Sequence, residues 1–431
     1  AELYELLEDP GETENRIARE SAIAQRLRAR LQKRLSESEP ANDARAVVDD
    51  GARARLQSLG YVGNRPVRAG RADEDAPDAK RLIAFHEQFQ ETLGRLTAGD
   101  FTEARTRSAQ MLSAHPEIAD VWILRGDIEV AAGRNAEAIP HYQKYLEETR
   151  ALGPTADAGR LRAQYNLANA LAAVGETQQA LTAYRAALEI DPQHINARYN
   201  LGLTLGESGA LDAAIAELER VIELDPGFPE GHYDLGYAFA LRGDAAAAER
   251  HYNEALRRRP DYAQASLRLG DLLAARGGAA AALAHYERVL DLHPELPEAY
   301  MKTARAHLSG GDQQAAVEIY HRALNRFPQW NAAAVELAWI LATSAEPSVR
   351  NGRQALSLAR GACAHLSDPN PRCLDTLAAA YAATGNFEQA ISVLERALEF
   401  VRQRGQGGRL QRILQSHLAA YRHGQPLFLE S

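Results

Sequence analysis

The sequence has few of the residues that would mark several classes of protein. Of 431 residues only two are cysteine, too few for a disulfide framework or a four-cysteine zinc site. Aromatic residues make up 6%, and no run of about 18 apolar residues could span a membrane. A net charge of −9 argues against a nucleic-acid partner, because affinity for phosphate comes from clustered lysine and arginine. Alanine and leucine are abundant instead, which favours many thin helical layers over one thick core.

The two cysteines, Cys363 and Cys373, flank one predicted loop at 364–372. We favour the interpretation that they are unpaired, small hydrophobic side chains in helices. A single local disulfide is the alternative if the compartment is oxidising, so the cysteines leave the compartment open. The chain begins at Ala1 without the pattern of a signal peptide, and we expect it to start after processing or partway through a longer parent.

The strongest signal is a repeat of 34 residues, in which five series of residues keep one register. Three series are the prolines Pro192, Pro226, Pro260, Pro294 and Pro328, the glycines Gly175, Gly209, Gly243, Gly277 and Gly311, and the alanines Ala180, Ala214, Ala248, Ala282 and Ala316. A large residue follows each alanine by four positions: Tyr184, Leu218, Tyr252, Tyr286 and Tyr320. A small residue precedes each glycine by seven positions: Ala168, Gly202, Gly236, Gly270 and Ala304.

Each series has a physical reason. The small residue of a first helix lets a second helix approach closely, and the tyrosine or leucine fills the gap beside it. The glycine lies where the first helix ends, because only glycine takes the left-handed cap conformation without strain. The proline stops the second helix. The spacing therefore predicts helix–turn–helix units whose apolar faces need a neighbour to cover them.

This pattern resembles the tetratricopeptide repeat (TPR), whose 34-residue unit has these residue types at these offsets. The resemblance implies an all-α fold, a right-handed TPR superhelix or α-solenoid. Regular units are predicted at 161–194, 195–228, 229–262, 263–296 and 297–330. Weaker units flank them at 85–118, 119–152, 331–370 and 371–404, and the unit at 331–370 has an insertion at 344–352. We expect a TPR array of about nine units over 80–404.

A capping helix is expected within 405–431, at about 409–421. Its stripe is predicted to contain Leu410, Ile413, Leu414, Leu418 and Tyr421. The opposite face is polar, as the terminal face of a solenoid must be.

Residues 1–62 lack the repeat and form a predicted leader, followed by a linker at 63–79. The leader is expected to contain a short strand at 2–6 and an amphipathic helix with the stripe Ile17, Ile23, Ala24, Leu27, Leu31 and Leu35. The run Glu-Leu-Tyr-Glu-Leu-Leu-Glu-Asp-Pro-Gly-Glu-Thr at 2–13, with Leu-Gly-Tyr-Val at 59–62, resembles the C-terminal end of sulfatase-family hydrolases. In some bacterial members TPR repeats follow the hydrolase. An unrelated helical leader is the alternative.

No motif in the sequence supports a catalytic function. The Cys/Ser-x-Pro-x-Arg motif of sulfatases is missing, as are the phosphate-binding, zinc-protease and serine-hydrolase motifs. Three of the thirteen histidines, His141, His251 and His285, share one repeat position. Equivalent positions on stacked repeats lie too far apart to ligate one metal, so we interpret them as solvated or helix-packing side chains. We predict no enzyme, no cofactor and no metal site.

A binding surface is better supported. In the TPR superhelix the first helix of each unit lines the concave face. The predicted peptide-binding residues on it are Tyr165, Asn166, Asn169, Tyr199, Asn200, Tyr233 and Tyr237. Asn166 and Asn200 resemble the asparagine ladder with which some TPR domains hold an extended peptide, since an amide can both donate and accept hydrogen bonds. The ladder stops at Asp234, and tyrosines that merely pack between helices are the alternative.

The sequence therefore predicts a non-enzymatic protein–protein interaction scaffold, with a protein or peptide as its partner. Self-assembly is a further hypothesis, because a leader that docks on the next copy would join copies head to tail into a filament or tube. The alternative is a regulatory or substrate-presenting C-terminal part of a sulfatase-like hydrolase. The sulfatase resemblance favours export from a bacterium over the cytoplasm.

Overall fold

The computed structural model describes residues 79–364, 370–404 and 408–428. The predicted leader at 1–62 and all but the last residue of the predicted linker lie outside the described residues. The chain divides into two units, Ala1–Gln90 and Glu91–Ser431. Of the first unit, only the beginning of one helix is described.

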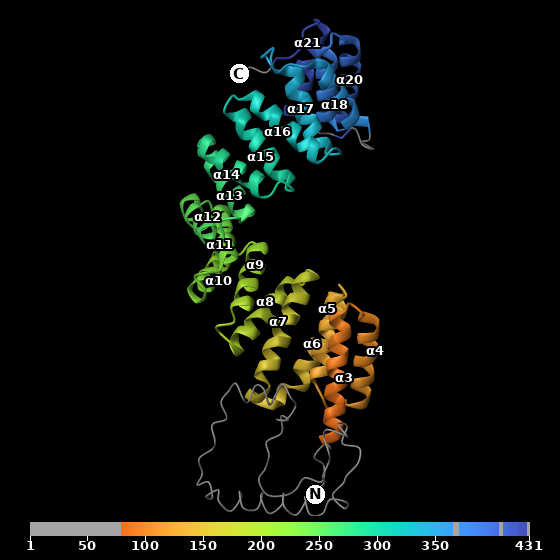
Figure 1. Ribbon diagram of the computed structural model, residues 1–431, viewed down its shortest axis with the longest axis vertical. Helices are drawn as coiled ribbons and strands as arrows, with labels where there is room; N and C mark the ends of the chain where they lie inside the picture. The colour runs from red at the N-terminus through yellow and green to blue at the C-terminus, as the bar shows by residue number, and fades with distance from the viewer. Residues whose placement is uncertain (1–78, 365–369, 405–407, 429–431) are drawn as a thin grey trace, which may run out of the picture. The chain divides into compact units, whose positions relative to one another are not determined.

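The described residues form helices and no strand, and the helices follow one another in pairs along the chain (Figure 1). The first helices are α3 (Ala79–Thr97), α5 (Asp120–Ala131), α7 (Asp157–Ala173), α9 (Ile195–Glu207), α11 (Pro229–Arg242), α13 (Ala263–Ala275), α15 (Pro297–Ser309), α17 (Asn331–Thr343) and α19 (Pro371–Ala383). The second helices are α4 (Phe101–Ala114), α6 (Asn135–Glu148), α8 (Thr177–Ile190), α10 (Leu211–Leu224), α12 (Ala245–Arg258), α14 (Ala279–Leu292), α16 (Gln313–Arg326), α18 (Gly352–Ala364) and α20 (Phe387–Gln403). A single helix, α21 (Arg409–Arg422), comes last.

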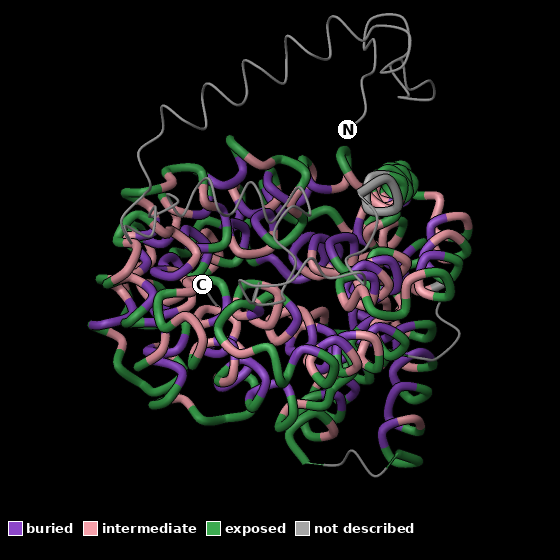
Figure 2. The backbone as a smooth tube through the Cα atoms, turned by 90° about the horizontal axis from the view of Figure 1, so that it is seen from below, coloured by how far each residue is buried: buried purple, intermediate pink, exposed green. Residues whose placement is uncertain are grey.

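The predicted repeat register coincides with the helices. Helices α9, α11, α13 and α15 each begin at the first residue of a predicted regular unit. From α4 to α21, each pair of consecutive helices packs together. Buried and exposed residues alternate along the helices, so the core is spread through the array (Figure 2). The predicted all-α solenoid is confirmed for the described residues.

The turn inside each regular unit depends on a glycine with positive φ. The five predicted cap glycines, at 175, 209, 243, 277 and 311, have φ between 80° and 88°. A side chain in this left-handed region is strained, which explains why glycine recurs there. Directly after two of these glycines, Asp244 and Asp312 accept hydrogen bonds from the backbone N–H three residues on and cap the second helix.

The close approach within each unit is a contact between a small residue and a tyrosine or leucine sixteen positions later. A Cβ added to Gly270 would lie 2.4 Å from Cε1 of Tyr286, and one added to Gly236 would lie 2.9 Å from Tyr252. In the weaker unit at 119–152, Gly126 stands in the same relation to Tyr142. The predicted close approach of the two helices is confirmed.

Two departures from the 34-residue spacing are absorbed between helices. The 3₁₀ helix η1 (Arg150–Ala156) follows α6 and leads directly into α7. The insertion after α17 is held by Ser344, whose hydroxyl donates to Oε1 of Gln313 at 2.5 Å, and by Asn351, whose N–H donates to the Leu341 carbonyl at 2.8 Å. The extra residues therefore leave the packing of successive helices intact.

Two expectations from the sequence are wrong. Cys363 and Cys373 form a disulfide that joins the end of α18 to the start of α19, because the packing of α18 against α19 brings their Cα atoms within 6.0 Å of each other. In α21, Leu414, Leu418 and Tyr421 are buried as predicted, but Leu410 and Ile413 are 37% and 39% exposed. Since α21 is the last helix of the described residues, no following helix covers its other side, and it buries a narrower stripe than predicted.

The contact between Gly270 and Tyr286 yields a test of the packing. We expect Gly270→Ala to lower the free energy of unfolding by about 1–3 kcal/mol, because the added methyl group meets the tyrosine ring. The control is Gly94→Ala in α3, where an added Cβ meets nothing within 4 Å. Better helix propensity should stabilise that variant by about 0.5–1 kcal/mol. Urea denaturation measures both, and equal stability of Gly270→Ala and the wild type would contradict the packing argument.

Candidate functional site

The seven predicted peptide-binding residues lie on three successive first helices. Tyr165, Asn166 and Asn169 are on α7, Tyr199 and Asn200 on α9, and Tyr233 and Tyr237 on α11. Consecutive first helices among α5, α7, α9 and α11 are in contact. All seven side chains are half-buried except Tyr237, which is 39% exposed.

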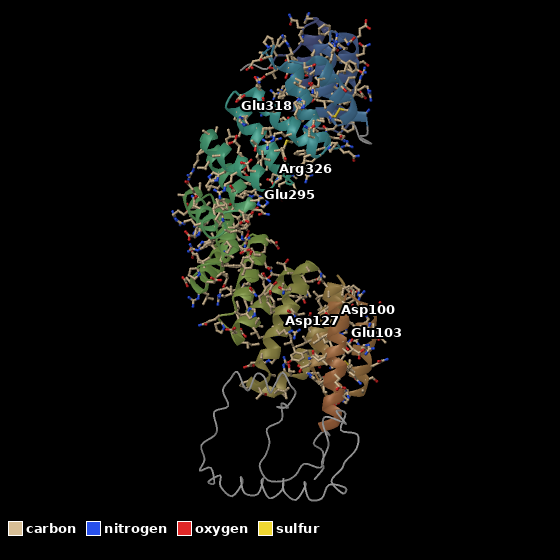
Figure 3. The ribbon with its side chains drawn as sticks, viewed as in Figure 1. Asp100, Glu103, Asp127, Glu295, Glu318 and Arg326 are labelled. Carbon is tan, nitrogen blue, oxygen red and sulfur yellow. A yellow bond between two sulfur atoms is a disulfide. The ribbon has the colours of Figure 1, made fainter. Side chains whose placement is uncertain are left out.

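Side chains at the sixth and ninth positions of the units form what we call the inter-unit row. Its members are Asp127, Asn166, Asn169, Asn200, Leu203, Asp234, Tyr237, Arg268, Asp271, Lys302, Arg305 and Glu336. In each pair of the row except Leu203 and Asp234, the ninth residue of a unit contacts the sixth residue of the next unit, usually 31 positions later. Where the unit at 119–152 runs on into η1, the separation grows to 39 positions, and Nδ2 of Asn166 donates to Oδ1 of Asp127 at 2.9 Å. Asp127 is marked on α5 in Figure 3.

The rule holds for different chemistries. Nδ2 of Asn200 donates to Oδ1 of Asn169 at 2.9 Å. The guanidinium of Arg268 lies 5.5 Å from the ring centroid of Tyr237, within cation–π range. Lys302 pairs with Asp271 at 2.6 Å, and Arg305 pairs with Glu336 at 3.6 Å. The repeated backbone geometry therefore brings the two positions together. The side chains at these positions determine whether the contact is a hydrogen bond, a cation–π contact or an ion pair.

The three predicted tyrosines at the fifth position pack against the last residue of their own unit. The ring of Tyr165 lies 5.2 Å from His194, that of Tyr199 lies 5.0 Å from Phe228, and that of Tyr233 lies 5.2 Å from Tyr262. The packing alternative therefore describes part of what these rings do. Because the rings are only half-buried, they also present surface to the outside.

The asparagines keep hydrogen-bonding capacity beyond their internal contacts. Oδ1 of Asn169 accepts from the Tyr184 hydroxyl at 2.7 Å as well as from Asn200. Nδ2 of Asn200 also lies 3.3 Å from the Tyr165 hydroxyl. Among the described residues, the hydrogen bonds of this pair use neither Nδ2 of Asn169 nor Oδ1 of Asn200. One donor group and one acceptor therefore stand side by side on α7 and α9.

Sequence reasoning missed the charged groups in the neighbouring units. Asp127 accepts from the Tyr142 hydroxyl at 2.8 Å and pairs with Arg162, while Glu336 pairs with Arg372 at 2.6 Å. The repeat frame contained the signal, because Asp127 is the ninth and Glu336 the sixth residue of its weaker unit. Arg162 and Arg372 both stand at second positions. Extending the frame to the weaker units would have placed all four on this face.

The histidines at one repeat position pack within their own units. His141 stacks on Trp122 with ring centroids 5.7 Å apart, His251 lies between His232 and Phe239, and Nδ1 of His285 lies 3.3 Å from the Ser266 hydroxyl. Burial lowers the pKa of His141 and His285, and it lowers the pKa of His251 to about 4. Across the described residues, no group of three or more potential ligands is placed to hold a metal ion.

Family models recognise most of the array. Models of the tetratricopeptide repeat match residues 117–193, 171–233, 233–297, 267–334 and 374–408, which together span more than half of the chain. The chain therefore belongs to the tetratricopeptide-repeat family. Arrays of this kind are protein–protein interaction scaffolds and are generally not catalytic. None of these matches falls within 1–62, so the resemblance to sulfatases is not shown.

Solved structures resemble the chain in fold. The C-terminal part of a TPR protein from Cytophaga hutchinsonii is 17% identical, with 57% of this chain and 97% of that chain covered and a TM-score of 0.48. MamA from Desulfovibrio magneticus is 21% identical over 41% of this chain and 96% of that chain, with a TM-score of 0.37. YrrB, described as a TPR protein with an unusual peptide-binding site, is 21% identical over 46% of this chain and 96% of that chain, with a TM-score of 0.38. No curated protein matches the sequence.

In the part of the chain that the structure describes, no helix combines the length and apolar character needed to cross a bilayer.

The buried position of His251 predicts a dependence of stability on acid. Its pKa is about 4 in the folded chain and 6.5 without the fold, so the unfolded chain takes up the proton first as pH falls. The stability that depends on neutral His251 is present above pH 6.5 and is lost progressively towards pH 4. His251→Phe keeps a ring on Phe239 but cannot be protonated. We expect its urea midpoint to fall less than that of the wild type between pH 7 and pH 4.

The control for this test is His423→Phe, which changes an exposed histidine. Its urea midpoint should follow the wild type across the pH range. If His251→Phe follows the wild type as well, protonation of His251 does not limit stability in acid.

Proposed function

We propose that the first-helix face of residues 161–262 binds an extended segment of a protein partner. The contacts would come from Tyr165, Asn166, Asn169, Tyr199, Asn200, Tyr233 and Tyr237. This goes beyond the family's general role as an interaction scaffold, because it names the surface and the form of the ligand.

The observation that supports the proposal is the unused hydrogen-bonding capacity of the asparagine pair. A peptide unit offers one N–H donor and one carbonyl acceptor, and it needs both groups bonded when it leaves water. Nδ2 of Asn169 offers the complementary donor and Oδ1 of Asn200 the complementary acceptor, and the hydrogen bond from Nδ2 of Asn200 to Oδ1 of Asn169 holds the two side chains in place. The half-buried rings of Tyr165 and Tyr199 supply apolar surface beside them.

A selection of linear peptides on the full chain tests this proposal. Asn200→Leu should weaken binding of the selected peptides about tenfold. One hydrogen bond to a partly buried group contributes about 0.5–1.5 kcal/mol, and the partner group is left unpaired. The matched control is Asn253→Leu on α12, where the exposed amide donates to the Glu249 carbonyl of its own helix.

Binding can be measured by fluorescence anisotropy with labelled peptides. Peptides that bind Asn200→Leu and the wild type equally well would place the ligand elsewhere. A selection from which no peptide binds would remove the proposal altogether.

Head-to-tail self-assembly through residues 1–62 is a second proposal, and a feature of the sequence favours it. The leader stripe Ile17, Ile23, Leu27, Leu31 and Leu35 needs to be covered, because exposing each such side chain costs about 1.5–3 kcal/mol. A neighbouring copy is one surface that could cover it. The alternative role, as a regulatory part of a sulfatase-like hydrolase, rests on the same leader.

Deleting residues 1–62 tests self-assembly. Light scattering should give a mass well above 47.1 kDa for the full chain at high concentration, and a monomer for the truncated chain. A full chain that stays monomeric, or a truncated chain that assembles equally well, would exclude this mechanism.

A further inference from the structure

Within the part of the chain that the structure describes, one acidic residue of the inter-unit row lacks a basic partner. Asp127 pairs with Arg162, Asp271 with Lys302, and Glu336 with both Arg305 and Arg372. Beyond the row, Asp375 on α19 lies 2.9 Å from His417. Among the described residues, no lysine, arginine or histidine pairs with Asp234, whose hydrogen bond comes from the Tyr199 hydroxyl.

The register explains why Asp234 lacks a basic partner. The rule that joins Asn169 to Asn200 and Asp271 to Lys302 joins positions 31 residues apart. For Asp234 the partner position is Leu203, whose side chain has no polar group. Asp234 is therefore the one carboxylate of the row that faces an apolar partner position.

The surroundings of Asp234 are aromatic and acidic. The Tyr199 hydroxyl donates to Oδ2 at 2.5 Å, and the ring of Tyr199 lies edge-on to Phe228. The neighbouring rings of Tyr233 and Tyr262 lie 5.2 Å apart. Glu230, one turn earlier on α11, adds a negative charge and pairs with Arg259, whose guanidinium lies 4.7 Å from the Tyr262 ring centroid.

The electrostatics of this site are unbalanced. Burial raises the pKa of the Asp234 carboxyl, the Tyr199 hydrogen bond opposes this change, and the charge of Glu230 raises the pKa further. The pKa of the Tyr199 hydroxyl is also raised, by burial and by Asp234, so this group remains a donor. A carboxylate that has lost part of its hydration and has no counter-charge gains from a cation brought to it.

We propose that Asp234, with Tyr199 hydrogen-bonded to it and Tyr233 next to it in the chain, binds a lysine or arginine side chain of the partner segment. This inference rests on the proposed function and adds the chemistry of the ligand. The carboxylate supplies a charged hydrogen bond, and the electron-rich ring faces supply cation–π attraction to an ammonium or guanidinium group. The basic side chains of the row are already paired with Asp271 and Glu336 or stacked on Tyr237, so the cation has to come from the partner.

The peptides selected on the full chain test this inference. We expect them to share a lysine or arginine at one position, and its replacement by alanine should weaken binding to the wild type about tenfold or more. In the Asp234→Asn variant of the protein, replacing that peptide residue by alanine should change binding less than about twofold. The asparagine still accepts from Tyr199 but carries no charge to bind a cation. The control is Asp212→Asn, which removes the same charge from a side chain that is 88% exposed on α10.

The outcomes separate this inference from the proposed function. Peptides that depend on Asn200 but show no preference for a cation, or whose preference survives in Asp234→Asn, would refute the cation site alone. A library from which nothing binds would refute both. Asp234→Lys gives a reciprocal arm, since it should turn the preference towards acidic peptides.

Stability without a ligand supplies an independent measurement. Asp234→Asn removes an unbalanced charge, so its urea midpoint should stay unchanged or rise. Asp271→Asn breaks the pair with Lys302, so its midpoint should fall. If the urea midpoint of Asp234→Asn falls as much as that of Asp271→Asn, Asp234 stabilises the fold and does not bind a ligand. That result overturns the inference.

Discussion

The contact between a small residue on the first helix and a tyrosine or leucine on the second sets the dimensions of each unit. With Gly270 against Tyr286 or Gly236 against Tyr252, the two helices are as close as their side chains allow. Repeating this contact repeats the unit's geometry, and repeated geometry brings the ninth position of one unit to the sixth of the next. The row of polar contacts across the first helices depends on this close packing.

Different parts of the row do two things: some side chains hold consecutive units together, and others keep polar groups for a ligand. Along most of its length, from Asp127 to Glu336, each side chain is satisfied by a neighbouring unit, which joins consecutive units. At Asn169 and Asn200 the internal hydrogen bond leaves a donor and an acceptor unused, and at Asp234 the charge is unmatched. The residues that the fold leaves incomplete thus gather on α7, α9 and α11, within the part of the face where the sequence predicted binding.

Much of the fold could be predicted because periodic residues carry it. The glycines with positive φ, the small residues beside tyrosines and the starts of four first helices all follow from the 34-residue register. Features that depend on a single local conformation could not be predicted in the same way. The bond between Cys363 and Cys373 depends on how the ends of α18 and α19 pack together. The exposure of Leu410 and Ile413 depends on which sides of the last helix are covered by other helices. Likewise, the contacts that satisfy Asp127, with Tyr142, Arg162 and Asn166, come from different helices brought together by the fold.

The disulfide has a consequence for how the array comes apart. In a linear array each unit is held only by its neighbours, so end units fray first and fraying proceeds inwards one unit at a time. The bond between α18 and α19 ties the unit at 331–370 covalently to the unit at 371–404. The two units are already joined by the chain, and the bond closes a loop with a sequence separation of 10 between them. This limits how far the two helix ends can separate when the interface opens, and so favours re-closure. We therefore expect the last two units of the array to open together and not one at a time.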